Sequence, residues 1–104
     1  MRPKKERFVE CEPGERCFRP RCKKLSELER VSLSIDEFEA VRLYDLEGLE
    51  QSEVARRMNV HRSTVSRMLD SAHRKIADAL VNIKAIRIEG GCYRLTGEKE
   101  EPRP

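Results

Sequence analysis

The feature that most constrains this fold is a long helical repeat of apolar residues beginning just after position 61. Apolar side chains recur there at three- and four-residue spacings for about five turns, with no internal proline. The repeat consists of Val65, Met68, Leu69, Ala72, Ile76, Ala79, Leu80 and Ile83. The spacing predicts a helix over residues 62–83, with one apolar stripe that other parts of the chain must cover.

A supporting helix is predicted directly after Ser34. Serine is a favourable N-cap residue, and Asp36 and Glu37 follow in the first turn, where carboxylates suit the positive end of the helix dipole. Gly48 is a natural end for this helix. Its expected apolar face contains Phe38, Ala40, Val41, Leu43, Tyr44 and Leu46.

Between these two segments, residues 51–68 meet the requirements of a helix-turn-helix. Two short helices that cross closely need a small residue at the crossing, apolar residues facing inward and a turn residue that tolerates positive φ. Ala55 is the small residue, and Asn59 occupies the turn. The inward positions are Val54, Met58, Val60, Val65 and Met68. The second helix of the motif is then the start of the long helix.

The exposed face of that second helix has the chemistry of a DNA-reading surface. Arginine can donate two hydrogen bonds to a guanine, which makes Arg62 and Arg67 the best candidate base readers, and serine and threonine contact bases or phosphates. The groove-facing candidates are His61, Arg62, Ser63, Thr64, Ser66 and Arg67. The alternative is that these residues are only the solvated face of an amphipathic helix.

Other residues are candidates for phosphate contacts, which set register but read no sequence. Gln51 and Ser52 begin the first helix of the motif, where backbone N–H groups favour anions. Arg2, Lys4 and Lys5 lie in a basic N-terminal segment. Together these residues predict a positively charged surface around the reading helix.

Composition sets the class of protein. The 104 residues suit one domain, and 39% of them are charged. Basic residues predominate in residues 1–24 and 51–84, and acidic residues in 25–50. With no apolar run near 20 residues and no apolar signal core, we expect a cytoplasmic protein with no membrane contact. We find no phosphate-binding glycine loop and no nucleophile with a plausible base, and so expect no enzyme.

The ends of the chain are predicted to meet in a small β structure. Residues 1–24 form a basic arm rich in cysteine and proline, with a short strand at residues 7–10. An alternating stretch at residues 85–89, closed by two glycines, predicts a second strand that pairs with the first. The expected fold is mainly α, with a two-stranded β patch, a helix-turn-helix domain over residues 25–95 and a disordered tail over 96–104.

Residues 33–80, LSIDEFEAVRLYDLEGLEQSEVARRMNVHRSTVSRMLDSAHRKIADAL, resemble the region-four helix-turn-helix of bacterial sigma factors, within the winged-helix-like superfamily. With RPKK, CFRP and IRIEGG added, residues 2–91 look like an uncharacterised prokaryotic family of predicted DNA-binding proteins, uncharacterised protein family zero-two-five-one, domain of unknown function one-three-four. The resemblance implies that Arg62, Ser63, Thr64, Ser66 and Arg67 read the groove. One departure is His61, where such helices often begin with serine or threonine.

Cys11, Cys17, Cys22 and Cys92 allow three interpretations. Four thiolates close a tetrahedral zinc site, and a structural zinc would order an arm that has few apolar residues. The spacing is looser than the usual CxxC pairs. The other two interpretations are free thiols and a redox pair. An iron–sulfur centre is a less favoured alternative to zinc.

Two classes of function remain for the helix-turn-helix. The first is sequence-specific binding of double-stranded DNA by a transcriptional regulator, as a homodimer because one small motif reads only a few base pairs. The second is a protein-interaction module that docks on RNA polymerase or another partner, using the acidic residues 36–50 as a surface unsuited to DNA.

Overall fold

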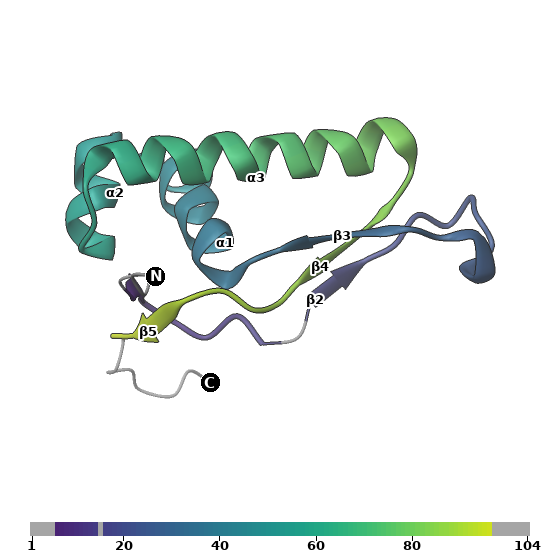
Figure 1. Ribbon diagram of the computed structural model, residues 1–104, viewed down its shortest axis with the longest axis horizontal. Coiled ribbons are helices and arrows are strands. Elements are labelled where there is room, and N and C mark those ends of the chain that lie inside the picture. Colours follow the sequence, from purple (N-terminus) through teal and green to yellow (C-terminus); the bar gives the residue numbers. More distant parts are fainter. Residues whose placement is uncertain (1–5, 15, 97–104) are drawn as a thin grey trace, which may run out of the picture.

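The computed structural model of the protein describes residues 6–14 and 16–96. Its longest element, α3 (Arg62–Asn82), runs along one side of the molecule (Figure 1). α2 (Gln51–Met58) packs against the N-terminal end of α3, and α1 (Ile35–Val41) lies between α3 and the strands. The helix predicted from the apolar repeat is therefore confirmed, ending at Asn82.

Below the helices, short strands form two small sheets in the described part of the chain. The strands are β1 (Arg7–Val9), β2 (Arg16–Phe18), β3 (Arg30–Leu33), β4 (Ala85–Ile88) and β5 (Tyr93–Leu95), with a 3-10 helix η1 (Leu25–Glu27) between β2 and β3. β1 pairs with β5 in parallel. β4 lies between β2, which is antiparallel to it, and β3, which is parallel to it.

The predicted pairing of residues 7–10 with residues 85–89, as one two-stranded patch, is wrong. The chain turns at Gly90 and Gly91, which have positive φ, and it is β5 beyond this turn that meets β1. β4 is instead occupied on both edges by β2 and β3. A strand of three or four residues carries too little pattern to specify its partner, so tertiary packing decides the pairing. The result is a small domain with both helices and sheets.

Two apolar clusters meet on α3. The cluster under the helix-turn-helix contains Ala40, Leu43, Val54, Ala55, Met58, Val65, Met68 and Leu69. The cluster above the strands contains Val9, Leu33, Ile35, Ala72 and Ile88. Because α3 contributes buried residues to both, its single apolar stripe holds the helical part and the β part together.

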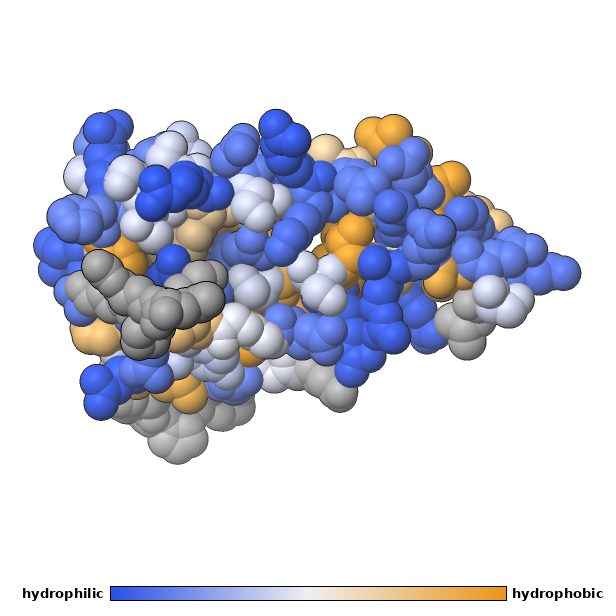
Figure 2. Space-filling view, in the orientation of Figure 1, coloured by the Kyte–Doolittle hydropathy of each residue, from blue (hydrophilic) through white to orange (hydrophobic). Residues whose placement is uncertain are grey.

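The C-terminal end of α3 is less covered than its start. Leu80 is 73% exposed, contrary to its predicted inward position, because helix α1 covers only the earlier turns of α3. In Figure 2, apolar side chains reach the surface near this end of α3, while much of the surrounding face is hydrophilic.

No helix in the described residues has both the length and the apolar character needed to cross a membrane.

α1 begins as predicted. Ser34 caps it with a reciprocal capping box, in which the Ser34 hydroxyl accepts from the Glu37 N–H at 3.3 Å and the Glu37 carboxylate accepts from the Ser34 N–H at 3.0 Å. The expected end near Gly48 is also confirmed, since this glycine has a φ of 76°.

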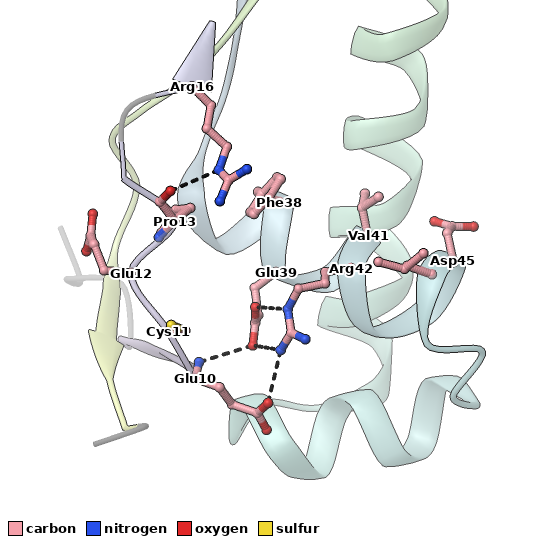
Figure 3. A pocket seen from close by; sticks show the side chains of 11 residues that line it. Glu10, Cys11, Glu12, Pro13, Arg16, Phe38, Glu39, Val41, Arg42 and Asp45 are labelled. Atoms are coloured by element: carbon pink, nitrogen blue, oxygen red, sulfur yellow. Dashed lines mark hydrogen bonds and ion pairs between the residues drawn. The ribbon is translucent and has the colours of Figure 1, made fainter. Parts of the chain in front are cut away.

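The helix changes pitch before it ends. After Val41 the chain forms a π-helical turn, η2 (Arg42–Leu46), closed by a hydrogen bond from the Glu47 N–H to the Arg42 carbonyl. The wider turn alters the phase of the side chains, so Leu43 remains buried but Leu46 is 79% exposed. The prediction that Leu46 faces the core is wrong for this reason. Figure 3 shows Arg42 and Asp45 leaving this segment in different directions.

The turn at Gly90 and Gly91 gives a testable prediction. A Cβ at Gly91 would lie 2.5 Å from the Asp36 Oδ1, whereas a Cβ at Gly90 would meet nothing within 4 Å, although both glycines have positive φ. Gly90→Ala should cost about 1–2 kcal/mol of stability through backbone strain alone. Gly91→Ala should cost about 1–3 kcal/mol more, because the methyl group must displace a buried carboxylate. Urea unfolding of both variants measures the difference, and equal losses would contradict this account.

Candidate nucleic-acid interface

Residues 51–68 form two helices joined by a short turn, the arrangement predicted for a helix-turn-helix. Asn59 adopts the left-handed conformation, with φ 59° and ψ 48°, and its N–H donates to the carbonyls of Ala55 and Arg56. Val54, Met58 and Val65 are completely buried, and Ala55 and Met68 are nearly so. The turn residue and the inward-facing residues were therefore predicted correctly, and α3 is held against α2 by close apolar packing.

The outward face of α3 contains most of the predicted groove-facing residues. Ser63, Arg67, Asp70 and Arg74 follow one another at helical spacing along the exposed side, and Ser66 is exposed beside them. Arg62 is exposed at the first helical position. Asp70 was not noticed in the sequence as part of this face. Its carboxylate is 73% exposed and lies 3.7 Å from Arg74, so the purely basic and hydroxyl-bearing part of the face is confined to the first turns.

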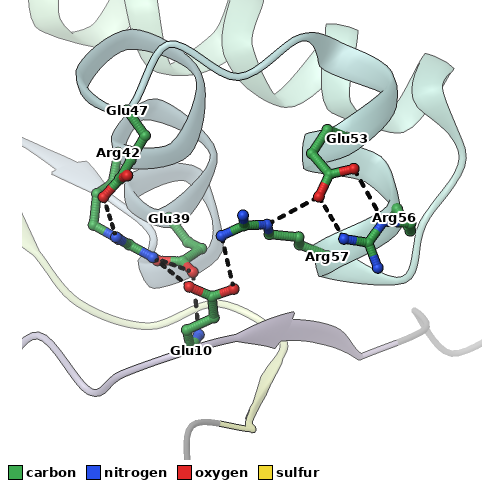
Figure 4. A network of polar contacts seen from close by, with 7 residues as sticks. All are labelled: Glu10, Glu39, Arg42, Glu47, Glu53, Arg56 and Arg57. Carbon is green, nitrogen blue, oxygen red and sulfur yellow. Dashed lines mark hydrogen bonds and ion pairs between the residues drawn. The ribbon is translucent and has the colours of Figure 1, made fainter.

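Within the described chain, Arg62 and Arg67 form no ion pair or hydrogen bond, which distinguishes them from many of the other arginines. Arg42 bonds Glu39, Glu10 and Glu47, and Figure 4 shows Glu10 between Arg42 and Arg57. Such arginines already have their charge neutralised by neighbours. The guanidinium groups of Arg62 and Arg67 are available to another molecule.

Glu53 pairs with both arginines of α2. It hydrogen-bonds the guanidinium groups of Arg56 and Arg57, and these bonds lower the pKa of its carboxyl to about 2. The carboxylate is therefore ionised at neutral pH, and it offsets one of the two positive charges that these arginines bring to the surface.

Predicted contact residues line several hollows around the start of α3. Gln51, Arg62, Ser63 and Ser66 line one hollow of about 320 Å³ between the starts of α2 and α3. Thr64 and Arg67 line a second, also of about 320 Å³, which extends toward α1 and Gly91. Residues far apart in the sequence, such as Gln51 and Ser66, are thus brought together.

The two helix N-termini at this surface have no side-chain cap. Neither His61, before α3, nor Glu50, before α2, accepts a capping hydrogen bond from the helix. The weak capping expected of His61 is confirmed, and first-turn N–H groups remain open to an anion. Glu50, the last residue of the predicted acidic stretch 36–50, is exposed beside Gln51 and Ser52. Its negative charge opposes a phosphate at that helix end.

The expectation of a broad acidic surface over residues 36–50 is wrong for its first half. Asp36, Glu37 and Glu39 are buried and paired, Asp36 with Arg7 at 3.0 Å, Glu37 with Lys75 at 2.8 Å and Glu39 with Arg42 at 2.9 Å. Burial of carboxylates requires such partners, so these residues hold elements together. Asp45, Glu47 and Glu50 remain exposed.

Comparison with known proteins identifies the family. Residues 1–96 match the family model described as "Protein of unknown function DUF134". The chain belongs to the DUF134 family. A UPF0251 protein of Caldanaerobacter subterraneus is 56% identical over 97 residues, covering 93% of this chain and 82% of that protein. No solved structure matches the chain.

Two other relatives show that DUF134 chains differ in length. UPF0251 proteins of Moorella thermoacetica and Methanosarcina mazei are 55% and 50% identical over 94% and 98% of this chain. The matched residues make up 66% and 63% of those two proteins. Their remaining residues lie outside the match.

The structure of this DUF134 protein does not bring the four cysteines together. Cys11, Cys17 and Cys22 are exposed free thiols, and Cys92 is half-buried. Cys92 precedes β5 and Cys11 follows β1, so the parallel pairing places them beyond opposite ends of the two strands. Among the described residues no three His, Cys, Asp or Glu side chains form a metal-binding group. A four-cysteine zinc site stays a prediction and would require the arm to rearrange.

Glu37 holds α1 against α3 through hydrogen bonds from Ser71 and Lys75, so the stability of the fold should depend on pH. Burial raises the pKa of this carboxyl, but hydrogen bonds from Lys75, Ser71 and the Ser34 backbone together outweigh burial and hold the pKa below 4.5. A lowered pKa stabilises the fold above about pH 4.5, and that stability is lost as the pH falls through the folded-state value.

Glu37→Gln should therefore lower the free energy of unfolding at pH 7 by about 1–3 kcal/mol, and should flatten its decline between pH 5 and pH 3. Urea unfolding at several pH values measures both effects. Glu27→Gln, at an exposed position without a described partner, is the matched control and should follow the parent protein. An unchanged pH profile in Glu37→Gln would contradict the assignment.

Proposed function

We propose that this protein binds double-stranded DNA sequence-specifically and regulates transcription. The observation that carries the proposal is the pair of exposed arginines, Arg62 and Arg67, that have no partner in the described chain and lie in the first turns of a helix held by a helix-turn-helix core. We assign the motif to the sigma region-four-like group of the winged-helix-like superfamily on its sequence resemblance. Recognition helices of this class read bases with their N-terminal residues.

In this proposal α3 enters the major groove with its first turns. Arg62 and Arg67 read guanines, and Ser63 and Ser66, between them on the exposed face, contact base edges or phosphates. Thr64 and His61 flank this face and would lie toward the sugar–phosphate wall of the major groove. The exposed carboxylate of Asp70 repels the DNA backbone, which limits the contact to the helix N-terminus.

Backbone contacts would fix the register of the complex. Gln51 lines the same hollow as Arg62, and Gln51 and Ser52, at the start of α2, offer polar side chains and open N–H groups to a phosphate. The predicted phosphate contacts of Arg2, Lys4 and Lys5 fall outside the described residues. A second copy bound one DNA turn away would double the contact, and the homodimer stays a prediction made from the size of the motif.

The alternative of docking on RNA polymerase or another protein has less support than the sequence suggested. Its argument was the acidic stretch 36–50, whose buried carboxylates are committed to internal ion pairs. A salt-resistant complex with a protein, without DNA affinity, would be the result expected from that alternative.

The proposal is tested by selecting bound fragments from genomic DNA with the purified chain. The parent should enrich a recurring motif, and the double variant Arg62→Ala, Arg67→Ala should lose it, with about 1–3 kcal/mol of discrimination lost for each base contact. Arg74→Ala is the matched control, because Arg74 is exposed on the same helix beyond the proposed contact. Retention of the motif by the double variant would refute the assignment, as would its loss in the Arg74 control.

Glu50 provides a test of opposite sign. Since its charge lies beside the proposed phosphate contact, Glu50→Gln should tighten DNA binding at low salt by a few fold, and the gain should shrink as salt rises. Glu27→Gln removes one charge at another exposed position and should change affinity less. Binding isotherms at several salt concentrations measure this, and weaker binding by Glu50→Gln would place the DNA elsewhere.

A further inference from the structure

A second feature lies on α1 and η2, outside the residues assigned to DNA. The segment after β1, together with Arg16, forms one side of a cleft of about 870 Å³, and α1 and η2 form the other (Figure 3). This volume is within the range of small-molecule sites, roughly 300–1,000 Å³. None of the predicted DNA-contact residues that the structure describes lines the cleft.

The α1 and η2 side of the cleft contributes three apolar side chains, Phe38, Val41 and Leu46. Phe38 and Val41 are half-buried there, and Leu46 is exposed at the rim because the π turn directs it away from the core. Single π turns occur frequently at functional sites, where they redirect side chains. Exposed leucine and phenylalanine surface in a concave setting favours the apolar body of a ligand.

Arg16 supplies a fixed and open positive charge. Its Nε donates to the Pro13 carbonyl at 2.9 Å, and its guanidinium carbon lies 5.6 Å from the centre of the Phe38 ring. These two contacts orient the guanidinium over the aromatic wall. Its terminal amino groups have no hydrogen-bond partner among the residues described. A guanidinium held with two donors open is suited to bind a carboxylate in bidentate fashion.

The other charged groups that line the cleft are already paired. Glu39 is buried and accepts from Arg42 and from the Glu10 N–H. Every side-chain nitrogen of Arg42 donates to a carboxylate. Further out, Asp45 bonds His73, and Glu12 accepts from the Tyr93 hydroxyl. These carboxylates are therefore poorly suited to capture a cation, and Arg16 is the charge left for a ligand.

We infer that this cleft binds a small amphipathic carboxylate. Its carboxylate pairs with Arg16, and its apolar or aromatic body lies against Phe38, Val41 and Leu46. A cationic ligand is disfavoured because Arg16 covers the Phe38 ring.

The site is linked to both helices of the helix-turn-helix. Asp45, at the η2 end of the cleft, bonds His73 of α3 at 2.8 Å, and Glu10, at the other end, lies 3.5 Å from Arg57 of α2. A ligand that favours one placement of these segments changes the helices that they contact. The ligand therefore acts as an effector of DNA binding. This last step rests on the proposed function, whereas ligand binding itself does not.

The experiment uses the full chain and 1-naphthoate as the probe, with 1-naphthamide and 1-naphthylmethylammonium as matched neutral and cationic probes. Calorimetry should give naphthoate an affinity about tenfold or more above that of the amide, because the charge-assisted pair is lost in the amide. Two-dimensional NMR should place the shifts at Phe38, Val41 and Leu46. No naphthoate binding at millimolar concentration, equal affinity for the amide, preference for the cation, or shifts located elsewhere would each overturn the inference.

Two variants identify the charge responsible. Arg16→Gln should bind acid and amide equally, while Arg74→Gln, which removes an exposed arginine that does not line the cleft, should keep the acid preference. NMR spectra establish that both variants are folded. An acid preference that survives in Arg16→Gln would overturn the role of Arg16.

A final measurement separates the effector step from the binding step. Saturating naphthoate should shift the DNA affinity of the parent several-fold and leave that of Arg16→Gln unchanged. If naphthoate binds but the protein has no DNA affinity, the ligand site stands and the proposed function fails. If DNA binds and naphthoate does not, the ligand inference fails and the proposed function stands. Naphthoate binding with unchanged DNA affinity would overturn the effector role alone.

Discussion

Burial of the apolar stripe on α3 is the constraint on which the rest of this structure depends. One side of the stripe is covered by α1 and α2, and the other by α1 and the strands, so both apolar clusters meet along the same helix. A chain with so many charged residues has few apolar side chains to bury, and it gathers them around this element. The exposed side of α3 is thereby fixed as well, because a helix that buries one face must present the other.

Buried carboxylates complete what apolar packing begins. Glu37 caps α1 and also accepts from Ser71 and Lys75 of α3, which fixes the rotation of α3 about its axis. Glu39 binds Arg42, and Glu10 contacts both Arg42 and Arg57. Because Glu10 directly follows β1, these contacts join the N-terminal strand to the helix-turn-helix. These pairs use Glu10, Glu37 and Glu39 to hold elements of the fold together. The arginines at the start of α3 are left without such partners, and this difference between paired and unpaired arginines gives the surface its character.

Predictions from the sequence were correct wherever contacts among a few neighbouring residues determine the local structure. The periodicity after residue 61, the cap at Ser34 and the left-handed turn at Asn59 all depend on contacts within one or two helical turns. Errors arose where the helix departs from regular α geometry or where a strand pairs with a distant segment. Leu46 was assigned to the core because a regular helix would place it there, and the π turn moved it to the surface. The strand at residues 85–88 was recognised, but its partners β2 and β3 were not, since three- and four-residue strands carry no readable preference for a neighbour.

For the candidate site, the sequence by itself determined which residues face outward from the second helix of the motif, because helical spacing fixes that direction once the buried stripe is known. The sequence did not determine which charged side chains remain without an ion-pair partner and can bind another molecule. Only the tertiary structure decided that Asp36, Glu37 and Glu39 are buried ion-pair partners, and that Arg62 and Arg67 have none among the described residues. The tertiary structure also assembled the cleft of Arg16 and Phe38, from segments more than twenty residues apart. Periodicity is a property of neighbours in the chain, whereas neutralisation of a charge and enclosure of a cavity depend on which distant segments fold against one another.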